Sequence, residues 1–437
     1  MLRRAITFAG ALGALAVLSG SGFAQDTAPR VATVIHAGRL LADPSNGRVL
    51  TQQSILVGAD GNILGIEPGY VTREGATAID ETNRFVLPGL TDSHVHLTSE
   101  LGPNQLLEEV QLTVADQTMR GAENARKTLM AGFTTVADLG ANNDAIFAVR
   151  RAVRENRIPG PRIIAAGSAI TPDGGHADAN GFAPDIINVL RSVSACSGAD
   201  ACMRATRRQI QAGADIIKIT ATGGVLSNTA AGVSQQLTDP EMAAIVQAAH
   251  MMGRRVTAHA HGTDGINAAL RAGVDSIEHG TYLDRESVRL LHQGNRYLIP
   301  TMMAGWWVGQ LAERGGVLTP AQTEKARRVG PDLIRMVRFA HAQGVRMAFG
   351  TDTGVSPHGM NAREFQLLVE AGYTPLQAIQ MATVNAADHL QLNTVTGRVA
   401  QGMAADIIAV DGDPLTDVAT FMNVRFVMAR GTVYKSE

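Results

Sequence analysis

Composition and charge limit what this chain of 437 residues can do. It has 38 basic and 40 acidic side chains and a formal net charge of -2. Such a balance gives no electrostatic basis for binding nucleic acid or an anionic membrane surface, so we expect a small molecule as the partner. The length exceeds what one hydrophobic core usually serves, which predicts a large domain with a smaller accessory domain.

Residues 1–24 have the pattern of a signal peptide. A basic start at 2–4 precedes an apolar run at 5–18 and a small-residue end, Gly22-Phe23-Ala24. The apolar run is shorter than the roughly 20 residues that span a bilayer. We therefore expect cleavage near Gln25 and a periplasmic or secreted protein with no membrane attachment afterwards, with an uncleaved anchor as the alternative.

Both ends of the mature chain have the sequence pattern of short β-strands separated by turns. Short β-prone runs between 32 and 82 are separated by turn signals such as Asp60-Gly61, which indicate tight hairpins. The same pattern returns after Gly397. We expect one β-sandwich domain built from residues 25–84 and 391–437, with a long insertion between its two parts.

Residues 85–390 contain a repeated sequence pattern. A predicted helix ends in glycine, a short apolar strand follows, and a polar residue ends the strand. Glycine suits the left-handed position after a helix. Eight strands are predicted, at residues 85–90, 135–138, 162–165, 216–218, 256–259, 276–279, 298–301 and 347–352. Strands separated by helices favour a closed parallel (β/α)8 barrel of the TIM type, in the α/β class, over an open sheet.

Cys196 and Cys202 are the two cysteines of the chain. An oxidising compartment favours a disulfide that joins them across a short loop. Zinc binding is the weaker interpretation, because the chain has no further cysteine to complete a thiolate site.

Ligand-type side chains close several predicted strands. His94 and His96 are two residues apart, so a strand would present both on one face, and neutral imidazole is a common zinc ligand. A surface turn is the alternative for this pair. The later strands end in Lys218, His259, His279 and Asp352. Strand ends of a barrel meet at one mouth, so these six side chains together predict a metal site.

Two of the six residues indicate the chemistry. A buried unpaired ammonium is costly, so Lys218 either reacts with CO2 to form a carbamate that bridges two metal ions or pairs with a nearby acid. Asp352 could be a helix N-cap. Beside five other ligand-type residues it is instead expected to accept the proton of a water held by two divalent ions, which indicates a hydrolase.

The motif Val86-Leu-Pro-Gly-Leu-Thr-Asp-Ser-His94-Val-His96 and the split β domain resemble the amidohydrolase superfamily over nearly the whole mature chain. The resemblance implies two divalent metal ions, with Zn2+ expected, and a metal-bridging hydroxide as nucleophile. It assigns His94 and His96 to one ion, His259 and His279 to the other, an N6-carboxylated Lys218 to the bridge, and Asp352 to both ligand and base.

Within that superfamily, segments 218–227, 258–262 and 278–281 are most similar to the secreted Xaa-Pro dipeptidase (prolidase) and ochratoxin amidohydrolase branch. This similarity implies cleavage of the amide bond in dipeptides or N-acyl amino acids. It gives His261 a contact with the substrate carbonyl, and a role behind the metal ligands is the alternative. His176, on a long loop, could bind substrate or simply be solvated. We also expect a homo-oligomer.

Two other functions stay open. A cyclic-amide hydrolase of the imidazolonepropionase or dihydroorotase kind would use similar ligands, although the signal peptide argues against cytoplasmic substrates. A secreted protein that binds a metal or another ligand without catalysis is the second alternative.

Overall fold

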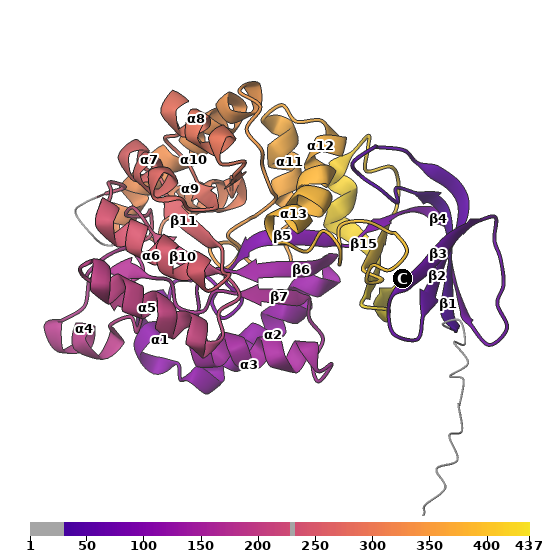
Figure 1. Ribbon diagram of the computed structural model, residues 1–437, viewed down its shortest axis with the longest axis horizontal. Coiled ribbons are helices and arrows are strands. Elements are labelled where there is room, and N and C mark those ends of the chain that lie inside the picture. Colours follow the sequence, from indigo (N-terminus) through magenta and orange to yellow (C-terminus); the bar gives the residue numbers. More distant parts are fainter. Residues whose placement is uncertain (1–29, 228–231) are drawn as a thin grey trace, which may run out of the picture.

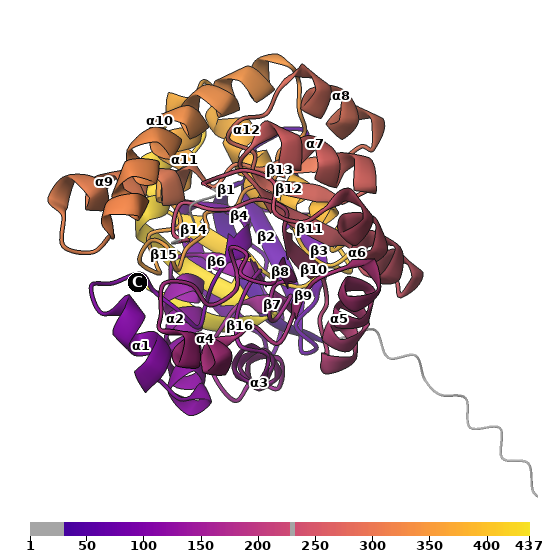
Figure 2. The same ribbon diagram turned by 90° about the vertical axis from the view of Figure 1, so that its left-hand side faces the viewer.

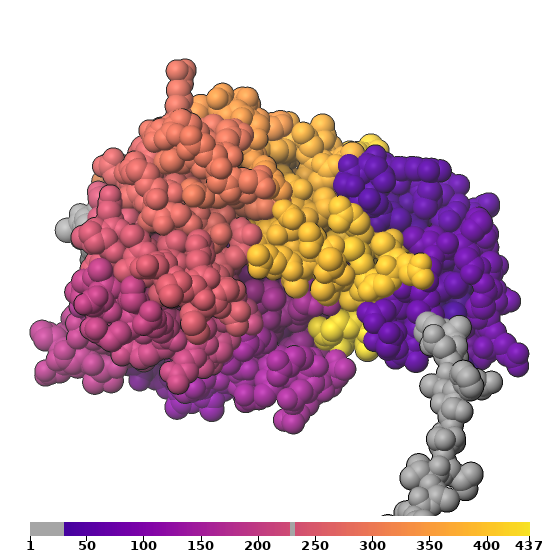
Figure 3. Space-filling model, viewed as in Figure 1, coloured from indigo at the N-terminus to yellow at the C-terminus, as the bar shows by residue number. Residues whose placement is uncertain are grey.

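The computed structural model describes residues 30–227 and 232–437. The predicted signal peptide at 1–24 lies outside the described residues. Figure 1 shows the strands from the two ends of the chain, in indigo and yellow, side by side at one end of the molecule, while the intervening residues form a larger body of helices and strands. In the space-filling view, yellow C-terminal residues lie between the indigo strands and that larger body (Figure 3).

The two ends of the chain share one seven-stranded sheet. Its order is β16-β15-β14-β4-β1-β2-β3. The strands are β1 (Val31–Leu40), β2 (Leu50–Gly58), β3 (Ile63–Pro68), β4 (Thr77–Pro88), β14 (Ile407–Val410), β15 (Val424–Ala429) and β16 (Thr432–Ser436). The predicted assembly of both ends into one β unit is thus observed as a single hydrogen-bonded sheet, and its packing as a sandwich stays a prediction.

The apolar run before His94 belongs to two sheets, which corrects the prediction of one strand over 85–90. Phe85 to Pro88 complete β4 in the terminal sheet, and the first strand of the larger body is β5 (Leu90–Val95). Gly89 is the break between them. A Cβ there would lie 2.2 Å from Thr134 Oγ1, so only glycine lets the chain pass between the sheets at this point.

The larger body contains parallel strands in two groups, β5-β6-β7 and β10-β11-β12-β13. The further strands are β6 (Phe133–Asp138), β7 (Arg162–Ala165), β10 (Ile217–Thr220), β11 (Val256–Ala260), β12 (Ser276–His279) and β13 (Tyr297–Ile299). Single parallel bridges join Ile170 to Ile219, Leu298 to Met347, and Val95 to Thr353. These bridges link the groups in cyclic order, which favours the predicted barrel without forming one continuous sheet.

The predicted eighth strand at 347–352 is not a regular strand. Ala348 N donates to Leu298 O at 3.1 Å and Asp352 N donates to His94 O at 2.8 Å, so the segment lies between β13 and β5 as predicted. Asp352 has a φ of +57°, outside the range of an extended strand. The pairing of this segment consists of single bridges, at Met347 and at Thr353.

Helices surround these strands on the outside, as Figure 2 shows. They are α1 (Gln105–Gln111), α2 (Val114–Met130), α3 (Asn143–Arg154), α4 (Pro184–Leu190), α5 (Ala199–Ala212), α6 (Asp239–Met251), α7 (Thr263–Ala272), α8 (Arg285–Gln293), α9 (Met302–Arg314), α10 (Pro320–Ala342), α11 (Arg363–Glu370), α12 (Pro375–Gln380) and α13 (Ala386–His389). Gly213 and Gly273 end α5 and α7 in the left-handed conformation, as the helix-glycine pattern predicts. No helix among the described residues is long and apolar enough to cross a bilayer.

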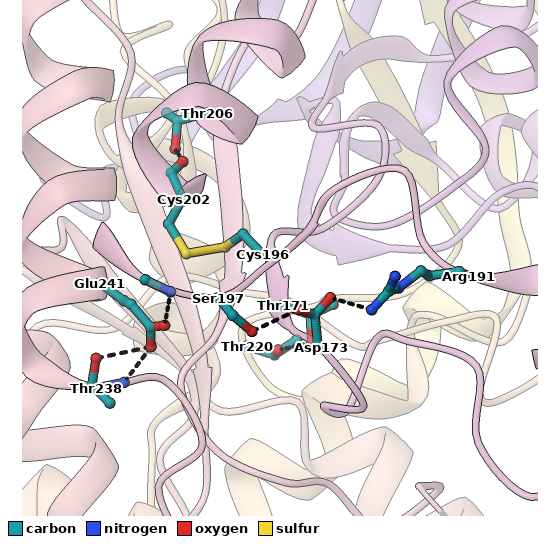
Figure 4. The surroundings of a disulfide bond; sticks show 11 residues. Thr171, Asp173, Arg191, Cys196, Ser197, Cys202, Thr206, Thr220, Thr238 and Glu241 are labelled. Atoms are coloured by element: carbon teal, nitrogen blue, oxygen red, sulfur yellow. Dashed lines mark hydrogen bonds and ion pairs between the residues drawn. A yellow bond between two sulfur atoms is a disulfide. The ribbon is translucent and has the colours of Figure 1, made fainter. Parts of the chain in front are cut away.

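A disulfide links the long connection between β7 and α5 to the helical layer. Cys196 and Cys202 are bonded, as predicted, and connect β9 (Ala195–Cys196) to α5 (Figure 4). β9 pairs with β8 (Thr171–Pro172). Next to the disulfide, Glu241 of α6 accepts a hydrogen bond from Gly198 N at 2.6 Å. The residues between β8 and β9 therefore form a loop that is closed at its base.

We predict that the double substitution Cys196→Ala and Cys202→Ala lowers the free energy of unfolding by about 2 kcal/mol, the entropic effect of a short cross-linked loop. The cysteines are six residues apart and both are buried. Urea unfolding of the variant and of the reduced wild type should give the same midpoint. A midpoint equal to that of the oxidised wild type would contradict a stabilising role.

Candidate metal centre

The six predicted ligands lie together in or next to the parallel strands; β10 runs two residues beyond Lys218, which the sequence pattern places at the strand end. They are His94 of β5, His96 just after it, Lys218 of β10, His259 of β11, His279 of β12 and Asp352 after the irregular segment. Their ligand atoms form two overlapping groups, His94/His279/Asp352 and His259/His261/His279, each with all atoms within 4.8 Å of one another. Either group could hold a metal ion.

His94 is at the middle of these contacts. Its Nε2 lies 3.2 Å from Lys218 Nζ and 3.4 Å from Asp352 Oδ1. His96 Nε2 lies 3.1 Å from the same Asp352 oxygen. The side chain of His94 is 1% exposed, so these contacts exclude bulk water. The alternative of His94 and His96 in a surface turn is wrong.

The Nδ1 atoms of three of the histidines have partners that hold the ring proton. His94 Nδ1 lies 2.7 Å from the Glu278 carboxylate, and His96 Nδ1 lies 2.8 Å from Gly140 O. His279 Nδ1 lies 2.6 Å from Thr301 Oγ1, whose own hydroxyl donates to Pro300 O. Each Nδ1 is therefore the donor, so in the neutral ring Nε2 is the atom that carries the lone pair. Imidazoles held in this tautomer fit a metal site.

Glu278 is not among the residues that the sequence pattern predicts for the site. Burial acts to raise its pKa, but the adjacent His94 outweighs that effect and holds the pKa below the ordinary value. Glu278 and His279 are consecutive, yet both contact His94, whose ring centroid is 5.4 Å from that of His279. A φ of +69° at His279 breaks the strand alternation and allows this.

Backbone strain is concentrated at the site. His279, Thr301 and Asp352 all have positive φ values, of +69°, +48° and +57°. Non-glycine residues rarely adopt this conformation, at a cost of about 1 to 3 kcal/mol each. All three residues are buried; His279 ends β12, Thr301 follows β13, and Asp352 follows the irregular segment. In a regular strand these side chains would point elsewhere. The positive φ values turn them toward the centre.

Glu364 of α11 caps the N-terminus of α9 in place of the N-cap residue Thr301. The Thr301 hydroxyl bonds His279, so it does not cap α9. Met302 N and Met303 N donate instead to the Glu364 carboxyl at 3.1 and 2.6 Å. Burial raises the pKa of Glu364 to about 8. This buried acid thereby leaves Thr301 free to orient a candidate ligand.

Lys218 has no carboxylate partner within 4.0 Å among the described residues. Burial lowers the pKa of its ammonium group, and the more distant Glu278 and Asp352 oppose that shift only in part. The side chain is 5% exposed. The structure therefore does not show the alternative of a lysine in an ion pair, and burial disfavours the charged form of the amine at this position.

Asp352 does not cap a helix, because its carboxylate contacts His94 and His96 and the next helix, α11, begins at Arg363. Burial acts to raise the pKa of Asp352, but these two histidines outweigh burial and hold the pKa well below the ordinary value. Asp352 is therefore an ionised carboxylate that faces the centre, the form that a proton acceptor requires.

Two further histidines join the cluster. The His261 ring stacks on that of His279 at 4.7 Å, and its Nδ1 lies 2.7 Å from Thr281 Oγ1. The His176 ring stacks on that of His259 at 4.2 Å. Burial lowers the pKa of His261 to about 4 and that of His176 to about 3, so both rings are neutral. His176 is thus not a solvated loop residue, because its loop folds back over the centre.

Asp92 links β5 to the segment that ends in Asp352. Its carboxylate accepts hydrogen bonds from Thr351 Oγ1 at 2.6 Å, Asn361 Nδ2 at 2.8 Å and His94 N at 3.1 Å. Burial raises its pKa to about 6. Asp92 is also absent from the predicted set. Alternation is the signal that could have found it, because it precedes His94 by two residues.

Comparisons with known proteins identify the family of this chain. The amidohydrolase family model matches residues 85–434. Ochratoxinase of Aspergillus niger is 30% identical over 417 residues, which span 90% of this chain and 84% of that protein. A solved Xaa-Pro dipeptidase with bound methionine in its active site has a TM-score of 0.87 at 36% identity, covering 92% of this chain and 100% of that one.

The solved structure of A. niger ochratoxinase has a TM-score of 0.80 at 27% identity, covering 92% of this chain and 95% of that one. The predicted resemblance to the Xaa-Pro dipeptidase and ochratoxinase branch is thereby confirmed. Together with the matched family model, these similarities show that the chain belongs to the amidohydrolase family and is a hydrolytic enzyme that acts on amide bonds.

Proposed function

We propose that this enzyme is a binuclear metal-dependent amidohydrolase that cleaves the amide bond of dipeptides or N-acyl amino acids. The convergence of six ligand-type side chains, with His94 in the middle, is the observation that supports it. The similar proteins point to the substrate class, since they include an Xaa-Pro dipeptidase and a prolidase complexed with N-methylphosphonate-L-proline, which is 28% identical.

The donor set divides between two sites. We assign His94 and His96 to one ion, His259 and His279 to the other, and an N6-carboxylated Lys218 to the bridge, with Asp352 as a further ligand. Zn2+ suits imidazole and carboxylate ligands. A pair of divalent ions, when bound, polarises the amide carbonyl and lowers the pKa of water. The Nδ1 partners of His94, His96 and His279 support this assignment, because they leave Nε2 as donor atoms.

Asp352 and His261 have separate tasks in this proposal. The Asp352 carboxylate takes the proton of the attacking water and passes it to the leaving amine nitrogen. When the Thr281 hydroxyl donates to His261 Nδ1, the ring proton is on Nε2, which can then donate to the oxygen that gains negative charge. His176 borders the same space and is proposed to contact substrate.

The proposal also includes the wider organisation. Bridges between the parallel strand groups favour a closed (β/α)8 barrel. Four further points stay predictions. Two concern the domains, a β-sandwich domain of residues 25–84 and 391–437 and a hydrolase domain of residues 85–390. The others are secretion or periplasmic localisation after removal of residues 1–24, and a homo-oligomer. A cyclic-amide hydrolase and a non-catalytic binding protein are the functions to be tested against it.

We expect zinc-loaded enzyme to hydrolyse members of a library of Xaa-Pro, Xaa-Phe and Xaa-Arg dipeptides and N-acyl amino acids. A chelator should abolish the activity and added Zn2+ should restore it, because the histidine cluster needs ions to polarise the amide. Release of free amino acid, measured by mass spectrometry, is the readout. Turnover of a cyclic ureide or lactone alone would favour the cyclic-amide alternative, and no turnover at all would favour a binding protein.

We expect Asp352→Asn to lower kcat by about 10²- to 10⁴-fold, the range for loss of a general acid-base, while KM changes little. Steady-state kinetics of the purified variant give kcat and KM, and metal analysis shows whether the variant still holds its metal ions. Asp144→Asn is a matched control, since Asp144 is exposed on α3. If Asp352→Asn keeps both its metal content and its kcat, the proton-transfer role is wrong.

We expect recovery of activity in chelated enzyme to depend on CO2 as well as on Zn2+. A carbamate on Lys218 requires CO2, and the buried amine, free of a carboxylate partner, is the form that reacts. Activity should return faster with bicarbonate than in CO2-depleted buffer, and Lys218→Gln should not respond to bicarbonate. Equal recovery with and without bicarbonate would argue against carboxylation.

A further inference from the structure

Lys325 is a cation near the centre that has no acidic partner. It lies in the second turn of α10 and is partly buried. No acid lies within 4.0 Å of its ammonium group among residues 30–227 and 232–437, whereas its neighbour Glu324 pairs with Arg328 at 2.7 Å. Lys325 Nζ instead donates to Gly224 O at 2.7 Å and to Ser227 O at 2.5 Å.

The turn that Lys325 holds is part of the wall of the centre. Gly223 O lies 3.3 Å from His259 Nε2. A Cβ on Gly224 would lie 2.3 Å from His176 Cε1, so the backbone of the turn touches that ring. Gln322, in the first turn of α10, binds Leu226 O at 2.6 Å and fixes the other side. Lys325 is therefore placed beside the two stacked histidines, from a helix 100 residues further along the chain.

The positive charge of Lys325 reaches this space. The carbonyl groups of Gly224 and Ser227 that bind the Lys325 ammonium belong to the turn that touches His176, which places this cation next to the same space. Arg191, on the loop that carries His176, is already paired with Asp173 at 3.0 Å. Lys325 is thus a partly buried cation beside the wall of the centre, and no acid among the described residues neutralises it.

We propose that the ammonium group of Lys325 binds the free carboxylate of the substrate on the amine side of the cleaved amide. This inference rests on the proposed function, which supplies a dipeptide or N-acyl amino acid as ligand. An ammonium has three donors, and two of them are used by neutral carbonyl oxygens. A carboxylate can take the third donor or replace a carbonyl, because a charge-assisted hydrogen bond is the stronger one.

A purely structural role makes a different prediction. If Lys325 only ties the 223–227 turn to α10, its loss disturbs charged and neutral substrates alike. If it recognises a carboxylate, its loss affects acids and spares their amides. The ratio of kcat/KM between an acid and the matching carboxamide therefore separates the two roles, even where a variant also lowers both rates.

The experiment uses the full-length, zinc-loaded enzyme and two substrate pairs, L-methionyl-L-proline and N-acetyl-L-phenylalanine, each with its carboxamide. We expect the wild type to prefer the acid. Lys325→Met should reduce the acid-to-amide ratio about tenfold or more, through KM of the acid, as expected for loss of a charged hydrogen bond. Lys325→Arg should keep part of the preference. Arg328→Met, on the exposed side of α10, is the control and should match the wild type.

A wild-type enzyme that does not prefer the acid, or an unchanged ratio in Lys325→Met, overturns the inference. Failure of the proposed function is recognised separately, as no hydrolysis of either pair by the wild type. In that case the role of Lys325 is tested by the binding of L-proline and L-prolinamide instead of by catalysis. L-proline should raise the unfolding temperature of the wild type more than L-prolinamide does, and Lys325→Met should lose this difference. Equal shifts in the two proteins, or no difference in the wild type, overturn the inference.

Discussion

The structure depends on the contacts of one imidazole, that of His94. Its Nδ1 binds Glu278 of β12, while its Nε2 faces Lys218 of β10 and Asp352, which follows the irregular segment after α10. Four regions of the chain must therefore meet at one buried point. A buried histidine among two acids and a lysine is costly unless each polar atom has a partner. The strand arrangement supplies those partners, and the candidate metal centre exists because of it.

The surrounding structure holds backbone conformations that the chain would not adopt alone. The φ values at His279, Thr301 and Asp352 are positive, and at His279 this allows the consecutive residues Glu278 and His279 both to contact His94. Buried acids outside the ligand set stabilise the strained ends, since Asp92 binds the Thr351 hydroxyl and Glu364 caps α9. Such strain persists only where the packing around it is rigid, and these strand ends are enclosed by helices (Figure 2).

Two less regular segments give the centre its outer wall. One is the loop between β8 and β9, which the Cys196–Cys202 disulfide ties to α5 and whose His176 stacks on His259. The other is the 223–227 turn, which Lys325 fixes to α10. The strand ends position the groups proposed for amide cleavage, whereas these segments border the space where the rest of a substrate must lie. Catalysis and substrate choice are thus assigned to different parts of the fold, a common division in α/β enzymes.

Much of the site follows from the sequence. The spacing of His94 and His96, and the polar residues that end later strands, predict the six clustered side chains because parallel strands with helical crossovers end at one edge. The paired β-rich ends likewise predict a shared terminal sheet. Other features required the tertiary structure. The apolar run 85–90 is continuous in sequence, but the structure divides it between two sheets at Gly89, where a side chain would collide with Thr134. Glu278 and Lys325 have no local pattern that marks them, because a backbone reversal places the first and a contact across 100 residues places the second.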